Sequence, residues 1–395
     1  MDDINNSIQE GRLLEVCFIP VWPKNPYHAQ LIRHLATKQV HVNGASSLKQ
    51  LTAEILAGRL CIDILHLHAV PSFQFSPLDL VRVCLNFRRL QILRRAGVRV
   101  ILTVHDLLAH ETRAANIDLL FGRITSRLTD AIIVHSQTSK NILPQAWNIK
   151  EPEKIHVLPH PHFIDCYNNS ISREESRRRF CLRNGETVFL FLGLIRPYKG
   201  VEDLIVAFRS IRNSNLRLII AGEPLTPQFG KKLSMSIAED RRIQFFPGFV
   251  APNDVQVFMN ASDAVVFPYR KIFTSGALVL AMSFGKACVA TATGSLDEIL
   301  PPEGGFLCAP NNPDSLRAAL LKAAETRSEL GNMGKRNRDR AQQWSWEAMA
   351  QQTAELYRSV QKNHPGTHSS HIDDHCKDNS DALRNNTKNL VQGLL

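Results

Sequence analysis

The stretch FPYRKIFTSGALVLAMSFGKACVAT, residues 267–291, combines three elements of a parallel α/β fold. An apolar strand end is followed by a Thr-Ser-Gly turn, an apolar helix that ends at Gly285, and a second apolar strand. The helix would begin at the turn, where its first backbone N–H groups have no partner inside the helix and can bind an anion. No carboxylate lies in the stretch. It therefore predicts a phosphate-binding turn that carries no acid or base of its own.

Strand and helix patterns of this kind alternate along the chain, from LEVCFIPV near the start to GGFLCAP near residue 308. This alternation is typical of α/β proteins, and 395 residues are too many for one ordinary core. We expect two doubly wound, Rossmann-like domains that face each other across an interdomain cleft. The predicted boundaries are a first domain at 1–165, a second domain with closing helices at 166–362, and a disordered polar tail at 363–395.

The net charge of +10 and the pI near 9.3 favour an anionic partner, which could be a nucleic acid, an acidic lipid surface or a phosphorylated substrate. Nucleic acid is the weakest of these, because no zinc-finger, RNP-like or helix-turn-helix pattern is present. Basic residues cluster at 87–99 and 172–180, and solvated helix faces are the simplest interpretation of both. The first residues do not resemble a signal peptide and no apolar run reaches about 18 residues, so we expect a cytoplasmic protein.

A second motif, FLFLGLIRPYKGVEDLIVAF, places Arg196 and Lys199 in a short loop between a buried strand and a helix. Two cations at such a turn can hold a diphosphate, because arginine offers a planar fork and lysine a point charge. A solvated loop is the alternative. No G-x-G-x-x-G follows a strand and no Walker A lysine loop exists, which argues against dehydrogenases and P-loop ATPases.

The Thr-Ser-Gly turn of the opening stretch adds the second half of this anion site. Backbone N–H groups of Ser275, Gly276 and Ala277 would point at a ligand, and the helix dipole adds about half a positive charge there. Thr274 or Ser275 could instead serve only as an N-cap.

The order of LGLIRPYKGVEDLIVAF, LRLIIAGE, FFPGFV, SDAVVFPY, TSGALVLAMSFGKACVAT and GSLDEIL resembles the C-terminal half of GT-B glycosyltransferases, most closely family 4 (group 1). The resemblance is specific over about residues 185–350, whereas the N-terminal half matches only in layout. It implies a nucleotide diphosphate sugar as donor and no other cofactor. The residues that it implies for donor binding are Arg196, Lys199, Gly248, Phe249, Val250, Thr274, Ser275 and Gly276.

The sequence departs from this family at two positions. The usual pair of glutamates is replaced by Ile272 and Leu280, so the site would stabilise a leaving diphosphate instead of supplying a base. The resemblance places His105 opposite the reacting sugar, and a base could come from the same turn. The predicted catalytic residues are therefore His105, Asp106 and Glu111, although the two acids could merely begin and cap a helix.

Metal catalysis is not expected, because no acidic partner accompanies the pairs His66-x-His68 and His160-x-His162 at ligand spacing. A basic face that contains Arg88, Arg89, Arg94 and Arg95 predicts peripheral contact with anionic membrane.

Together these features predict a metal-independent hexosyltransferase of polysaccharide or glycolipid biosynthesis. It would use GDP-mannose or a UDP-hexose and a lipid-linked or saccharide acceptor. The alternatives are a non-catalytic, degenerate glycosyltransferase that acts as a scaffold or regulator, and a nucleotide-sugar epimerase of the same fold.

Overall fold

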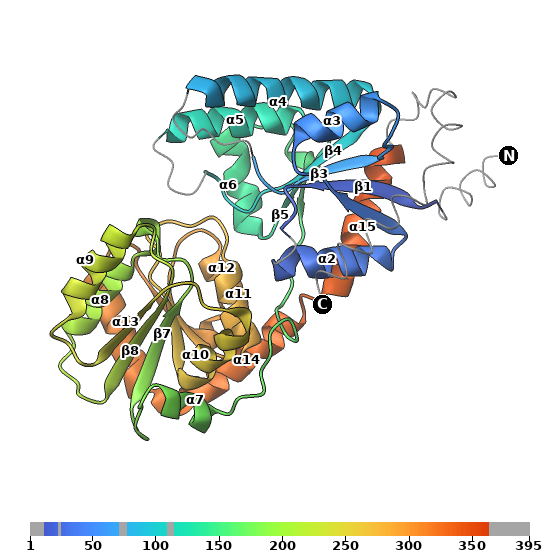
Figure 1. The fold of residues 1–395 in the computed structure, drawn as a ribbon. Coiled ribbons are helices and arrows are strands. Elements are labelled where there is room, and N and C mark those ends of the chain that lie inside the picture. Colours follow the sequence, from blue (N-terminus) through green and yellow to red (C-terminus); the bar gives the residue numbers. More distant parts are fainter. Residues whose placement is uncertain (1–11, 23–24, 71–76, 109–113, 363–395) are drawn as a thin grey trace. The chain divides into compact units, whose positions relative to one another are not determined.

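The computed structural model describes residues 12–22, 25–70, 77–108 and 114–362. The chain forms two compact units (Figure 1). The first contains the residues up to Pro159 and those from Trp346 onward, and the second contains His160–Ser345. Each unit has its own parallel sheet between helices, which confirms the predicted pair of doubly wound domains.

In the first unit, the described strands form one parallel sheet in the order β2-β1-β3-β4-β5-β6. Its strands are β1 (Leu14–Ile19), β2 (Val40–Gly44), β3 (Ile64–Leu67), β4 (Arg99–Thr103), β5 (Ala131–Val134) and β6 (Ile155–Val157). Its helices include α2 (Pro26–Ala36), α3 (Leu48–Leu56), α4 (Pro77–Arg95), α5 (Ala115–Arg127) and α6 (Gln137–Trp147). The chain reverses its direction of winding between β1 and β3, and ligands of such folds bind at that switch point.

In the second unit, the sheet has the order β12-β11-β10-β7-β8-β9. Its strands are β7 (Thr187–Leu192), β8 (Leu216–Gly222), β9 (Ile243–Pro247), β10 (Ala264–Phe267), β11 (Ala287–Thr291) and β12 (Gly305–Cys308). Its helices include α7 (Arg173–Arg179), α8 (Val201–Arg209), α9 (Pro227–Ile237), α10 (Val255–Ala261), α11 (Gly276–Ser283), α12 (Leu296–Ile299), α13 (Pro313–Glu325) and α14 (Leu330–Gln342). The winding reverses between β7 and β10.

The strands of the second unit are continuous apolar runs because helices cover both faces of a doubly wound sheet. Every residue of β7, TVFLFL, is buried, and so is every residue of β10 and β11. All six runs predicted for this unit form strands. The short strand β2, VHVNG, was not predicted, because only Val40 and Val42 of its residues are apolar and buried.

Helix α15 (Trp346–Lys362) corrects the predicted domain boundaries. It lies beside α2 in the first unit (Figure 1). The hydroxyl of its buried Tyr357 is 2.6 Å from Nδ1 of His66, and its Gln361 Nε2 donates to the carbonyl of Asp63 at 2.9 Å. The assignment of this helix to the second domain was wrong, since its amphipathic period shows a buried face but not which sheet covers it. The predicted tail at 363–395 lies outside the described residues.

Candidate functional site

The loops after β7 and β10 carry the predicted phosphate-binding residues, and these two strands flank the switch point of the second unit. The loops touch directly. Gly200 has φ +67°, and a Cβ at this position would lie 1.9 Å from the carbonyl oxygen of Pro268. The backbone N–H of Arg270 donates to the carbonyl of Tyr198 at 2.8 Å. The close approach therefore depends on a glycine where the first loop enters α8.

Arg270 joins the same two loops through its side chain. Its Nε and Nη2 each donate to a different carboxylate oxygen of Asp203 at 2.7 Å, a bidentate pair. This carboxylate raises the pKa of Arg270. The charge of Arg270 is thus matched by Asp203.

Lys199 lies in the space between the loops. Its Nζ is 5.7 Å from the centroid of the Tyr269 ring, within the range of a cation–π contact. A Cβ added to Gly193, at the end of β7, would be 3.6 Å from the same Nζ. Tyr269 is buried, which raises the pKa of its hydroxyl to about 12, while a hydrogen bond with Ser275 opposes that shift. Lys199, Tyr269 and Ser275 therefore form one contiguous group.

Arg196 is positioned by backbone carbonyls. Its Nη1 donates to the carbonyl of Ile195 at 3.1 Å and to that of Glu223 at 3.0 Å. These contacts hold the guanidinium at the carboxyl ends of β7 and β8.

The start of α11 has the N-cap that the sequence suggested as the alternative to an anion site. Ser275 is its N-cap and its Oγ accepts from the backbone N–H of Leu278 at 3.3 Å. The Oγ1 of Thr274 is buried and has no hydrogen-bond partner within the described residues. A buried hydroxyl without a partner is costly unless a water or ligand satisfies it. The Thr-Ser-Gly turn is therefore both a cap and an incompletely satisfied polar site.

His160 is a residue of this site that the sequence did not point to. A Cβ on Gly276 would lie 3.4 Å from its Nε2. Its Nδ1 is 2.8 Å from the carbonyl of Pro161, so Nδ1 carries the proton and, in the neutral ring, Nε2 is the acceptor beside the helix start. The sequence suggested His160 only as part of a possible metal pair. No spacing signal could have joined it to Gly276, because the two are far apart in the chain.

The turn 248–250, which is predicted to bind the donor, follows β9. Gly248 has φ +152°, and its N–H donates to the carbonyl of Gly222 at 3.0 Å. Phe249 is 74% exposed, and Val250 is half-buried. An exposed ring of this kind offers a face on which a nucleobase can stack. Ile272 and Leu280, where a carboxylate pair was expected, are both half-buried.

In the first unit, His105 and Asp106 follow β4 and are half-buried. Glu111 lies outside the described residues. The His105 ring is 5.2 Å from Tyr27 and from His135, and 5.9 Å from His68, measured between centroids. The structure thus surrounds His105 with aromatic rings and imidazoles at the ends of β3, β4 and β5, a feature that the sequence did not predict.

Burial favours the neutral form of three histidines of the first unit, His28, His66 and His135. It lowers the pKa of His66 to about 3, and that of His28 and His135 to about 4. His66 contacts the hydroxyl of Thr103 through Nε2 at 2.7 Å. In the part of the chain that the structure describes, no group of three or more His, Cys, Asp or Glu side chains is placed to hold a metal ion.

Comparison with known proteins matches both units. The family described as "Glycosyl transferases group 1" matches residues 172–340, and "Glycosyltransferase Family 4" matches residues 45–162. The chain is 29% identical over 237 residues to a GDP-mannose:glycolipid 4-beta-D-mannosyltransferase of Xanthomonas campestris, covering 58% of this chain and 61% of that protein. It is 30% identical over 223 residues to a D-inositol 3-phosphate glycosyltransferase of Corynebacterium efficiens, covering 52% and 51%. The matches thus span only part of each relative.

Solved structures share the fold at low identity. Sucrose-phosphate synthase from Thermosynechococcus elongatus has a TM-score of 0.72 at 18% identity, with 89% of this chain and 100% of that one covered. Alr3699/HepE of Anabaena, in complex with UDP-glucose, has a TM-score of 0.68 at 19% identity, with 88% and 100% covered. These structures show that the chain has the GT-B fold, and its two units match two glycosyltransferase family models, group 1 over residues 172–340 and Family 4 over residues 45–162.

Proposed function

We propose that the protein transfers a hexose from a nucleotide diphosphate sugar to a glycolipid or saccharide acceptor. The observation that supports the proposal is that the loop carrying Arg196 and Lys199 contacts the loop that leads into α11, at the switch point of the second unit. This arrangement suits the negative charge that develops on a departing nucleoside diphosphate. The cations are fixed by backbone carbonyls and a buried ring, so little reorganisation accompanies departure.

The catalytic part of the proposal concerns the turn after β4. His105 and Asp106 would face the sugar and the acceptor hydroxyl, with Glu111 in the same turn. Because Ile272 and Leu280 carry no acid, a proton acceptor would have to come from this turn or from the leaving phosphate. We propose that the reaction needs no metal ion, since the two cations can balance the diphosphate charge.

The nature of the donor and the acceptor rests on similar proteins. One is by name a GDP-mannose:glycolipid mannosyltransferase, which favours GDP-mannose and a lipid-borne acceptor for this chain. No helix in the described part of the chain is long and apolar enough to span a bilayer. Contact with a membrane would therefore be peripheral.

Helix α4 is the surface best suited to that contact. Val81 and Leu85 are 56% and 42% exposed, and Arg88 lies one turn beyond them on the same face. An exposed apolar stripe beside cations is suited to an anionic lipid surface. The basic face predicted from the sequence is smaller than expected, because Arg94 is bound by Asp130 at 3.2 Å and Arg89 donates to Asn86 at 2.9 Å.

The donor site is tested by thermal shift with GDP, UDP, GDP-mannose and UDP-glucose. Ligand at about a hundred times its dissociation constant should stabilise the folded protein by about 2.7 kcal/mol. The Arg196→Ala/Lys199→Ala double variant should lose this shift, whereas Lys231→Ala/Arg241→Ala, which removes two exposed cations elsewhere in the second unit, should retain it. No shift with any nucleotide in well-folded protein would overturn the proposal and favour a non-catalytic scaffold.

Membrane contact is tested by flotation with phosphatidylglycerol vesicles. Leu85→Gln/Arg88→Gln should weaken binding at least about fivefold, since one surface arginine contributes about 1 kcal/mol. The matched control is Met235→Gln/Lys231→Gln, on an exposed face of α9. Equal binding by both double variants would show that α4 is not the lipid-facing helix.

A further inference from the structure

A cavity of about 490 Å³ lies in the second unit, at the amino ends of the strands, whereas the donor loops follow their carboxyl ends. Its lining includes Arg173, Ser262, Asp263, Gly285, Lys286 and Arg327. Asp263 and Lys286 immediately precede β10 and β11, so the cavity opens at the amino ends of these strands. Arg196, Lys199 and Ser275 follow the carboxyl ends. The cavity is therefore separate from the proposed donor site.

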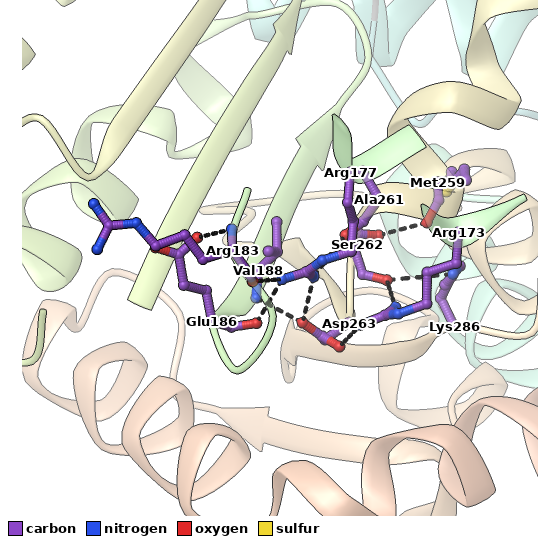
Figure 2. A network of polar contacts seen from close by, with 10 residues as sticks. All are labelled: Arg173, Arg177, Arg183, Glu186, Val188, Met259, Ala261, Ser262, Asp263 and Lys286. Atoms are coloured by element: carbon purple, nitrogen blue, oxygen red, sulfur yellow. Dashed lines mark hydrogen bonds and ion pairs between the residues drawn. The ribbon is translucent and has the colours of Figure 1, made fainter. Parts of the chain in front are cut away.

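The charges that line this cavity do not balance. Arg173, Lys286 and Arg327 are cationic, and Asp263 is the one carboxylate among the described lining residues. That carboxylate is already bound on several sides (Figure 2). Arg173 donates to Oδ1, the backbone N–H of Val188 donates to Oδ2 at 2.8 Å, and Nη1 of Arg177 lies 3.5 Å from Oδ2.

Arg177 belongs to this network but turns inward. It is 5% exposed, and its Nη2 donates to the carbonyls of Arg183 and Glu186 at 2.7 and 3.0 Å. The prediction that residues 172–180 form a solvated basic face was therefore wrong for this arginine. Because Arg177 shares Asp263 with Arg173, less of that negative charge remains to compensate Lys286 and Arg327.

Two of the lining cations, Lys286 and Arg327, have few hydrogen-bond acceptors among the described residues. Lys286 Nζ donates to the carbonyl of Ser262 at 3.3 Å, a weak and neutral acceptor for a buried ammonium. The pKa of Lys286 is lowered to about 8. Burial is the largest cause, nearby Arg173 acts in the same direction, and Asp263 opposes the shift. The Nε of Arg327 is buried and finds no hydrogen-bond partner among the residues that the structure describes.

We propose that this cavity binds a phosphate-bearing anion. A phosphate group would supply the acceptors that Lys286 and Arg327 lack and the negative charge that the lining needs, with Arg173 at the more exposed side. The cavity is large compared with the roughly 30 Å³ that one water occupies in the liquid, so the phosphate can carry a substituent. The same chemistry occurs in a free phosphorylated metabolite and in the headgroup of an anionic lipid.

The first arm of the test measures binding of inorganic phosphate by titration calorimetry. The full chain carries Arg196→Ala/Lys199→Ala, so that the proposed donor site does not contribute. In this background Lys286→Met and Arg327→Gln should each weaken phosphate binding at least tenfold. Lys231→Met, an exposed lysine of α9, should leave it unchanged. Arg327 is only half-buried, so its variant keeps the test valid if Lys286→Met fails to fold.

The second arm uses vesicles of phosphatidylglycerol, with phosphatidylcholine as the neutral reference. Phosphate binding that depends on Lys286 and Arg327 assigns the cavity to a free anion. Vesicle binding that depends on both, without phosphate binding, assigns it to a lipid headgroup. If neither ligand responds to either substitution, the proposal is overturned and the lining cations serve only to hold Asp263. This outcome is independent of the nucleotide shifts that test the donor site.

Discussion

At the scale of single residues, the donor loops depend on backbone positions that no side chain could occupy. Gly222 ends β8, and a Cβ there would lie 1.8 Å from the carbonyl oxygen of Gly193. Gly200 makes the equivalent approach to Pro268 on the other side of the switch point. These contacts bring the ends of β7, β8 and β10 together, and with them the loops that follow β7 and β10.

Gly200→Ala tests this close approach against a matched position. Gly285 has nearly the same φ, +65°, but a Cβ there meets nothing nearer than 3.6 Å. Gly285→Ala should cost about 1 kcal/mol through its left-handed backbone alone. Gly200→Ala should cost at least about 2 kcal/mol more, because the added methyl overlaps a carbonyl. Urea denaturation followed by circular dichroism measures both, and equal losses would contradict the steric argument.

The sequence pointed to residues that lie in continuous motifs, such as Arg196, Lys199 and Ser275, and their role in donor binding stays a prediction. It did not identify His160 beside Gly276 or Arg177 beneath Asp263, because these partners are distant in sequence and meet only through the sheet order. Hydrophobic periodicity fixes which residues are inside an element. It carries no information on which polar side chains from separate elements share a pocket.

At the scale of elements, α11 has two roles that can be separated. Ser275→Ala removes its N-cap and should cost about 1 kcal/mol, and it should also weaken nucleotide binding because the first turn frays. Thr226→Ala removes the equivalent cap of α9, where the Thr226 hydroxyl accepts from Phe229 N–H at 3.1 Å. This control should lose similar stability in thermal melts without a change in nucleotide affinity. If both variants bind nucleotide like the wild type, Ser275 stabilises α11 but does not contribute to donor binding.

The strand ends of the first unit should make its stability depend on pH. His28, His66 and His135 have pKa values of about 4, 3 and 4, below the ordinary 6.5 of an unfolded chain. Between these values the unfolded state binds protons that the folded state does not, so acidification favours unfolding. Stability should be full at pH 7 and fall by roughly 1 to 2 kcal/mol per histidine by pH 5.

His135→Gln checks this dependence, since it removes one titrating group while glutamine can still donate to the carbonyl of Leu158, the acceptor 2.9 Å from His135 Nδ1. Urea denaturation at pH 7, 6 and 5 should give a shallower loss of stability for the variant. An unchanged slope would mean that His135 becomes protonated in the folded protein near its ordinary pKa.

At the scale of the whole molecule, the boundaries differ from a simple division into an N-terminal and a C-terminal half. The first unit is made of two chain segments, and the second is inserted between them. The sequence predicted the class of both domains because most strands are short apolar runs that alternate with helices. The sequence placed α15 in the second domain, which precedes it along the chain. The structure places it beside α2, where the Tyr357 hydroxyl contacts His66 inside the first unit.

Fragments provide the test of this division. Residues 160–345 should fold alone and melt cooperatively by circular dichroism. Residues 12–159 should not, because this fragment lacks Met349, Ala350 and Tyr357, whose side chains are buried in the complete first unit. Joining residues 346–362 to that fragment through a flexible glycine-serine linker should restore a cooperative transition. A cooperative melt of residues 12–159 without the helix would show that α15 is dispensable.

The return of α15 also has a consequence for how the protein is made. During synthesis, the first sheet leaves the ribosome early, but the helix that packs beside it is translated only after the whole second unit, and the hydroxyl that contacts His66 belongs to a residue 291 positions later. Domains usually complete their folding in the order of translation. Here that order is reversed. The second unit can complete its folding first, whereas the first unit cannot complete its folding until α15 has been synthesised. A nascent chain that stalls before residue 346 would expose an unfinished domain to chaperones and proteases, although every strand of both sheets had already been synthesised.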